Sequence, residues 1–319
     1  MPNKLLKILG CLAGLSACSD SGNSPQSAEP SLLERYVLSS ESSVPEGIAF
    51  DSATRRFVVG SFNEASITAI EALGNETAIR DADNRAELTG IKVDEPRRRL
   101  WVCARNVDGI DNRVWVFDAD TGGLLREFFL GAIAVEGNCN DLALNSAGVA
   151  YVTDSDNPNI YELEFETGEA SLLISDPIFD GIDLGDRRLG LNGIALFEDE
   201  SRLIVGRFAP PSLFLVSLPN ADRVNEIALA GESLPFPDGI ALLAGDVYAV
   251  SDQAVSRVRL SDSFTNGTVS IAEGFSGLST ATVAEGNLYV IKSEVTNAAL
   301  GLPLDLPFEI LRVDLSSFD

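Results

Sequence analysis

Histidine is absent from this chain of 319 residues. Without an imidazole, the sequence cannot build a Ser-His-Asp or Cys-His catalytic arrangement, a histidine general base or a zinc site with histidine ligands. Basic residues are also few, because 23 lysines and arginines stand against 48 aspartates and glutamates, for a formal net charge of −25. Such a surface repels phosphate backbones, so the composition argues against a nucleic-acid partner.

Long apolar segments and helical patterns are missing as well. The longest apolar run near the N-terminus, ILGCLAGL, is too short to span a bilayer, and no long stretch repeats apolar residues with the period of a helix. Hydrophobic residues still make up 45% of the chain, which is enough for a sizeable core. These properties favour an all-β protein.

The N-terminus has the features of an export signal. Lys4 and Lys7 precede the apolar run, and the sequence LSAC that follows resembles a bacterial lipobox. This pattern predicts a signal peptide over residues 1–17, cleavage before Cys18 and lipidation of its thiol. The alternative is an ordinary secretory signal with an incidental cysteine. We therefore predict a lipid-anchored protein of the bacterial cell envelope that touches the membrane through this anchor only. Ser19 favours the periplasmic face of the outer membrane.

Most of the chain consists of six similar units. Their openings read PEGIAFD, LTGIKVD, CNDLALN, LNGIALF, PDGIALL and LSTATVA, and they recur at intervals of roughly 40–50 residues. Four strands in a unit of this length are typical of a β-propeller blade, whereas a sandwich or two small β domains would not produce six matching openings. We predict a six-bladed β-propeller with four-stranded antiparallel blades around a central channel over residues 35–319, preceded by a lipidated cysteine and flexible tether over 18–34. We expect FEILRVDLSS to pair with ERYVLSS, because an open ring would expose strand edges.

Equivalent positions of the six blades lie on a ring around the channel, so the polar residue of each opening should face one mouth. All six of these residues carry a side-chain oxygen: Glu46, Thr89, Asn140, Asn192, Asp238 and Ser279. Two carboxylates and two amides brought together without a cation would be poorly solvated. The set predicts a divalent cation, calcium first, with magnesium, manganese and zinc as the other choices. Alternatively these are turn residues, although Glu46 is no turn former.

At these residues the sequence resembles the gluconolactonase/regucalcin (senescence-marker-protein) family of six-bladed propellers. The motifs of that family occur in order as Pro45-Glu46-Gly47, Asn140-Asp141, Asn192-Gly193 and Pro237-Asp238-Gly239. The resemblance implies that Glu46, Asn192 and Asp238 bind the cation, and that Asn140 is a fourth ligand or a substrate contact. Asp141 is then a neighbour of the ligands, or else simply a turn carboxylate.

The chemistry that the resemblance implies is hydrolysis of a small-molecule lactone or related ester. The cation would polarise the carbonyl, and Asp238 would orient or deprotonate the attacking water. Two departures put a sugar substrate in doubt. Asn138 stands where the sugar-lactone enzymes have an arginine that contacts substrate, and Leu142 replaces a glycine. The competing interpretation is a non-catalytic envelope propeller that binds a ligand or protein partner and uses the cation as a structural element.

Further candidate residues surround this ring. Cys103 and Cys139 are expected to form a disulfide in an exported protein, bracing the turn at Asn140, with two buried free thiols as the alternative. Thr89, Ser279 and Arg105 are candidates for a second shell or for substrate contacts. The segment 104–113 is expected to cover the channel mouth, where Arg105 and Arg113 either meet an acidic substrate or pair with surface acids.

Overall fold

The computed structural model describes residues 30–106, 112–185 and 188–318. The predictions for the signal peptide, for Cys18 and for most of the tether concern residues outside these ranges. The chain divides into residues 1–31 and a compact unit that begins at Leu32. Within the described residues, no helix has the length and apolar character needed to cross a membrane.

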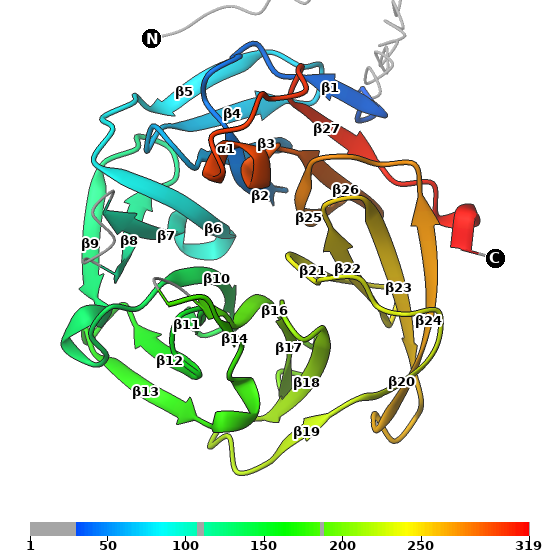
Figure 1. Cartoon of the computed structure of the whole chain (residues 1–319). Helices are drawn as coiled ribbons and strands as arrows, with labels where there is room; N and C mark the ends of the chain where they lie inside the picture. Colours follow the sequence, from blue (N-terminus) through cyan, green and yellow to red (C-terminus); the bar gives the residue numbers. More distant parts are fainter. Residues whose placement is uncertain (1–29, 107–111, 186–187, 319) are drawn as a thin grey trace, which may run out of the picture. The chain divides into compact units, whose positions relative to one another are not determined.

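The compact unit is a six-bladed β-propeller, which confirms the predicted fold class (Figure 1). In the first five blades the four strands pair antiparallel in sequence order and the first lies innermost, whereas in the sixth the N-terminal strand of the chain lies outermost, beside three C-terminal strands. Each innermost strand lies next to the inner strands of the two neighbouring blades. The first three blades have these strands: β2 (Pro45–Asp51), β3 (Arg56–Ser61), β4 (Ile67–Glu71) and β5 (Glu76–Arg80); β6 (Ala86–Asp94), β7 (Arg99–Asn106), β8 (Asn112–Asp118) and β9 (Leu124–Phe129); β10 (Cys139–Leu144), β11 (Val149–Asp154), β12 (Asn159–Glu164) and β13 (Ala170–Ser175).

The last three blades complete the ring. They have these strands: β16 (Leu191–Leu196), β17 (Arg202–Arg207), β18 (Ser212–Ser217) and β19 (Val224–Glu226); β21 (Ile240–Leu243), β22 (Asp246–Ser251), β23 (Ala254–Leu260) and β24 (Asn266–Glu273); β25 (Leu278–Ala284), β26 (Asn287–Lys292), β27 (Glu309–Arg312) and β1 (Arg35–Val37). A further strand, β20 (Ala228–Gly231), pairs parallel with β24. The remaining described elements are β14 (Ile182–Asp183), β15 (Arg188–Leu189), the helix α1 (Val295–Ala299) and the 3-10 turns η1 (Glu95–Arg97), η2 (Leu130–Ala132), η3 (Pro177–Phe179) and η4 (Leu315–Phe318).

The two ends of the propeller meet in the sixth blade. Strand β1 pairs antiparallel with β27, with Tyr36 opposite Ile310, so an N-terminal strand completes a sheet made by the C-terminal strands. This confirms the expected pairing between ERYVLSS and FEILRVDLSS. Because of this pairing the sixth blade contains strands from both ends of the chain, and the ring of blades is closed.

The core is divided among the interfaces between blades. Six clusters of buried apolar side chains occur in the described residues, one between each pair of neighbouring blades. In the interface between the second and third blades, Trp101 is fully buried and stacks on Phe128 with ring centroids 5.6 Å apart. Stability therefore comes from side chains that alternate between the two faces of each blade, as the strand pattern requires.

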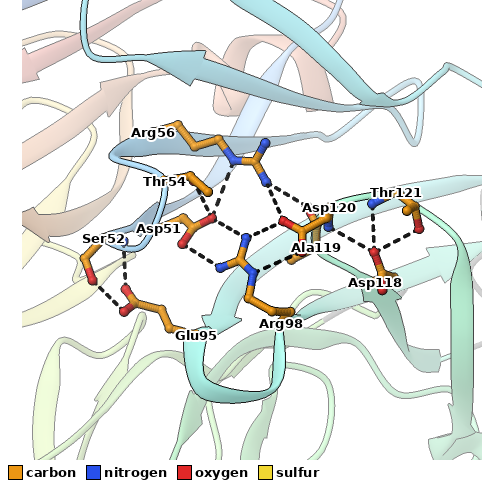
Figure 2. A network of polar contacts seen from close by, with 10 residues as sticks. All are labelled: Asp51, Ser52, Thr54, Arg56, Glu95, Arg98, Asp118, Ala119, Asp120 and Thr121. Carbon is orange, nitrogen blue, oxygen red and sulfur yellow. Dashed lines mark hydrogen bonds and ion pairs between the residues drawn. The ribbon is translucent and has the colours of Figure 1, made fainter. Parts of the chain in front are cut away.

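A polar network joins the first two blades where their inner strands end (Figure 2). Asp51 is fully buried, and its two carboxylate oxygens accept hydrogen bonds from Nη1 and Nη2 of Arg98, both at 2.8 Å. Thr54 donates a third bond at 2.6 Å, and Arg98 also bonds Asp120. Burial would raise the pKa of Asp51, but the hydrogen bonds from Arg98 and Thr54 outweigh it, so this pKa is lowered.

We expect Arg98→Met to lower the free energy of unfolding by about 2 kcal/mol at neutral pH, because a buried carboxylate loses its main donor. The native pKa of Asp51 is lowered, so its contribution is present above the unfolded pKa of about 4 and is lost as the pH falls through the native pKa. The difference between variant and wild type should therefore shrink in acid, as measured by urea unfolding.

Arg85→Met is the matched control, because Arg85 is exposed and pairs with Asp83 at the surface. This variant should unfold like the wild type at every pH. A loss in Arg98→Met that is equally large at neutral and acid pH would show that packing of the arginine, and not its pairing with Asp51, is responsible.

Candidate functional site

The polar residues of the six openings lie where the inner strands depart from regular pairing. In five blades the ladder between the first two strands is interrupted at the polar residue and the one after it, for example between Pro45 and Ile48 and between Leu191 and Ile194. The same interruption occurs in the second, third and sixth blades. In the fifth blade the pair Asp238-Gly239 directly precedes β21. Such bulges redirect side chains, and in the first, third and fourth blades the redirected polar residue lines a cavity at the central axis.

Four of the predicted residues share one cavity on the channel axis. Glu46, Asn140, Asn192 and Asp238 all line it, together with Asp141, Lys92 and Thr280. Glu46, Asn192 and Asp141 are buried, whereas Asn140 and Asp238 are partly exposed. The cavity measures about 10 Å³, which is room for a single water molecule or ion. Residues almost two hundred positions apart in sequence are thus brought around one small space.

The remaining two ring residues face away from this cavity. The Thr89 hydroxyl donates to the backbone carbonyl of Cys139 at 2.9 Å, and the Ser279 hydroxyl donates to the backbone carbonyl of Glu46 at 2.9 Å. Both side chains are buried and connect neighbouring blades. In the sixth blade, Thr280 takes the place in the cavity lining that was expected for Ser279.

The glycine after the polar residue allows neighbouring inner strands to approach closely. A Cβ on Gly47 would lie 2.1 Å from the carbonyl oxygen of Thr89, and a Cβ on Gly193 would lie 2.5 Å from that of Asp238. Gly90 and Gly239 are equally crowded by the next blade. These four glycines do not have positive φ. Close backbone approach, and not an unusual turn, is therefore what these positions require.

Two carboxylates of the cavity are electrostatically strained. Burial raises the pKa of Glu46 well above its ordinary value, and the carboxylates of Asp238 and Asp141 raise it further, while Lys92 acts in the opposite direction. Burial also raises the pKa of Asp238 to about 7, against the hydrogen bond from the Asn192 amide, and Asp141 adds to the increase. Both acids therefore lack compensating positive charge.

Asp141 is held by donors on both of its oxygens. Its Oδ1 accepts bonds from Lys92 Nζ at 2.9 Å and from its own neighbour Leu142 N at 2.8 Å, and Oδ2 accepts from Ile194 N at 3.3 Å. It occupies the position that is glycine in the first, second, fourth and fifth blades. Asp141 thus connects three blades at the axis, and this role fits a positioning residue better than a ligand.

Lys92 was not among the predicted residues. It stands in LTGIKVD where four other openings, PEGIAFD, CNDLALN, LNGIALF and PDGIALL, have alanine, and this difference was the available signal. The channel has a wider section of about 320 Å³ beside the cavity, and small side chains line it: Ala49, Ala143, Ala195 and Ala241. The lysine extends from this ring towards Asp141, and it is the basic residue that lines the cavity.

The loop that carries Asn140 is braced from several sides. Cys139 forms a disulfide with Cys103 of the second blade, with the two Cα atoms 5.3 Å apart. The Asn112 side chain accepts a bond from Cys139 N at 2.6 Å, and the buried Asp154 accepts one from Asn138 N at 2.8 Å. Asn140 is therefore anchored immediately on its N-terminal side.

The two arginines expected near the channel mouth pair with acids. Arg105 bonds Glu87 with Nη2 and Oε2 2.6 Å apart, and Arg113 pairs with Glu127. Neither residue lines the cavity. The middle of the segment between them, residues 107–111, lies outside the described residues, so its predicted position over the mouth stays a prediction.

The donor set suits a hard cation. Three carboxylates and one ammonium line the cavity, for a formal charge of −2, and the amides Asn140 and Asn192 add two neutral oxygens. In the described residues, no three acidic or cysteine side chains converge closely enough to form a metal centre by themselves. A cation here would depend on the two amides as much as on Glu46 and Asp238.

Solved structures share this architecture at low sequence identity. The allergen Mala s 1 from Malassezia sympodialis has a TM-score of 0.73 and 13% identity, covering 90% of this chain and 97% of that one. A gluconolactonase from Xanthomonas campestris has a TM-score of 0.61 and 17% identity over 89% of both chains. The calcium-binding protein regucalcin from Agrobacterium tumefaciens has a TM-score of 0.60 and 15% identity, covering 88% of this chain and 95% of that one.

These similarities establish the propeller fold. No protein-family model matches the sequence, and no curated protein matches it. The gluconolactonase and regucalcin structures share this fold, and their sequences are 17% and 15% identical to this one.

We expect Gly193→Ala to lower the free energy of unfolding by about 2–3 kcal/mol, because the new Cβ would strike a backbone oxygen that cannot move independently. Gly60→Ala is the control. Gly60 is also buried in a strand, but its nearest neighbour, Leu88 Cβ, would be 3.6 Å away. Thermal unfolding followed by circular dichroism distinguishes the two. Equal losses would mean that close approach at the axis is not the constraint.

Replacing both Cys103 and Cys139 by serine should lower the free energy of unfolding by about 3 kcal/mol, since the disulfide joins residues 36 positions apart. Reducing agent should destabilise the wild type by a similar amount and leave the double variant unchanged. Urea unfolding with and without reductant measures both effects. A wild type that is insensitive to reductant under unfolding conditions would contradict the role of the bond.

Proposed function

We propose that this protein is a metal-dependent hydrolase of lactones or related esters, with its reaction centre at the cavity on the channel axis. The observation that carries the proposal is the convergence of Glu46, Asn140, Asn192 and Asp238 around a space the size of one ion. The resemblance of these residues to the gluconolactonase/regucalcin motifs gives the reaction class, and the fold shared with a gluconolactonase is consistent with it.

Glu46, Asn192 and Asp238, with Asn140 as the fourth, are the residues that would hold a divalent cation. Calcium fits this all-oxygen set best, followed by magnesium, manganese and zinc. When bound, the cation would polarise the substrate carbonyl and stabilise the negative charge that develops on its oxygen. The unfavourable burial of Glu46 and Asp238 without a counter-charge supports this assignment.

The chain's own residues would handle the proton. The Asp238 carboxylate accepts a proton from water as the water oxygen attacks the carbonyl carbon. The carbon–oxygen bond of the lactone or ester then breaks, and the proton passes to the departing oxygen, which gives a hydroxy acid or an acid and an alcohol. The Asn192 amide hydrogen-bonds to the Asp238 carboxylate and so fixes its orientation. Lys92 and Asp141 hold the opposite wall of the cavity in place.

A second candidate is a non-catalytic propeller of the cell envelope that binds a ligand or protein partner and uses the cation structurally. Two observations favour it. The cavity has room for little beyond the ion itself, and Asn138 stands where sugar-lactone enzymes carry an arginine for the substrate. In either case the predicted lipid anchor at Cys18 would hold the propeller at a membrane surface.

Metal analysis tests the proposal directly. The purified wild type should retain or take up about one divalent cation per chain, and Asp238→Asn and Glu46→Gln should each weaken calcium binding at least tenfold in calorimetric titrations. Both variants should also lose lactone hydrolysis, because each removes a ligand from a set that depends on all four.

Asp262→Asn is the matched control, since Asp262 is an exposed carboxylate of the same blade as Asp238, does not line the cavity and does not influence the pKa of Asp238. It should bind calcium and turn over substrate like the wild type. A wild type that binds no divalent cation would overturn the site. Stoichiometric cation without hydrolysis of any lactone or ester would favour the second candidate.

A further inference from the structure

A second and larger hollow lies at the side of the channel mouth. It measures about 560 Å³, within the range of small-molecule pockets. One wall comes from the first blade, the other from the segment that follows β26 and contains α1. We call this hollow the side groove, and it is lined by Ser42, Val44, Phe62, Asn63, Glu87, Arg105, Ala298, Ala299, Gly301, Leu302 and Leu304.

The side groove and the cavity are lined by residues that lie close to each other in sequence. Val44 lies two positions before Glu46, and its carbonyl accepts a bond from Phe62 N at 2.7 Å, which places both groove residues at the entrance of β2. Glu87 lies two positions before Thr89 on the neighbouring inner strand. A molecule with its reacting group at the cavity could therefore extend along the groove between the first blade and the α1 segment.

The lining offers no unpaired charge to a ligand, and its polar members besides the Glu87–Arg105 pair are Ser42 and Asn63. The two charged residues in it, Glu87 and Arg105, bond each other at 2.6 Å and leave no free charge for a ligand. Apolar side chains make up most of the remainder, and Leu302 is 50% exposed to solvent in the described structure. An alkyl chain laid here would remove this exposed apolar surface from water.

The wall that carries Leu302 is fixed before any ligand arrives. At one end, Ser293 N and Glu294 N both donate to the carbonyl of Gly277, at 2.7 and 2.9 Å. At the other, Asp305 accepts a bond from Lys292 Nζ at 2.9 Å. A preformed wall lowers the entropic cost of binding, so a short apolar chain could bind measurably.

We propose that the side groove binds the neutral alkyl or acyl chain of the substrate, so that the protein acts on alkyl-substituted lactones or fatty acyl esters and not on hydrophilic sugar lactones. The statement about turnover rests on the proposed hydrolase function, whereas the statement about chain binding does not. The strongly acidic surface of the protein, with a net charge of −25, further favours a neutral chain over an anionic one.

Binding is tested with the neutral fluorescent probe N-phenyl-1-naphthylamine and its displacement by γ-lactones with alkyl chains of increasing length. Displacement should improve about two- to fourfold for each added methylene until the groove is full. Leu302→Asp should weaken binding of the probe and of the long-chain lactones at least tenfold. Leu300→Asp, on the same segment and also exposed but not lining the groove, should bind like the wild type.

Turnover separates this inference from the function it rests on. For the wild type, KM should fall with chain length while kcat stays constant; Leu302→Asp should remove this dependence, and Leu300→Asp should keep it. Chain binding without any hydrolysis would refute the hydrolase and leave the groove assignment intact. Hydrolysis with a KM independent of chain length, or equal effects of Leu302→Asp and Leu300→Asp, would overturn the groove assignment, as would occupancy by a peptide that alkyl lactones cannot displace.

Discussion

The inner strands of the six blades run so close together at the channel axis that, at one equivalent position, four of the blades have glycine. Gly47, Gly90, Gly193 and Gly239 each face backbone or side-chain atoms of the next blade at distances that no Cβ could tolerate. In the first and fourth blades the ladder is interrupted at this glycine and at the residue before it, and the bulge brings Glu46 and Asn192 to the cavity. The geometry of the candidate site is therefore a consequence of how the propeller closes around its centre.

The third and sixth blades have Asp141 and Thr280 at the position of this glycine, and Asp141 shows what the close approach of the strands permits. Asp141 can replace glycine in the third blade because Gly90, across the interface, leaves space for its carboxylate. That carboxylate then bonds Lys92 from one neighbouring blade and Ile194 N from the other. The lysine and the aspartate compensate each other, so the uncompensated charge of the cavity rests on Glu46 and Asp238. Burial raises the pKa of both of these acids.

The six repeated openings were sufficient to predict the number of blades, the closure of the ring by β1 and the meeting of Glu46, Asn140, Asn192 and Asp238 at one mouth, because equivalent positions of a closed repeat surround one axis. They could not show that Thr89 and Ser279 would bond neighbouring backbones instead, since this depends on side-chain rotamers at the bulge. The side groove was also beyond prediction. Its outer wall is an insertion after β26 that has no counterpart in the other blades, and repetition carries no information about such a segment.

The features that distinguish this protein from other propellers are therefore found where the sequence departs from the repeat. The repeated positions explain the fold and would be expected in any propeller that closes in this way. Lys92 in place of alanine, Asp141 in place of glycine and the inserted segment with Leu302 each interrupt the pattern, and all three border the cavity or the groove beside it. The repeat itself requires none of them, because most of the other blades close around the axis without them. The sixfold repeat therefore supplies a frame of side-chain oxygens around the axis, and its three interruptions make one sector of that frame different from the others.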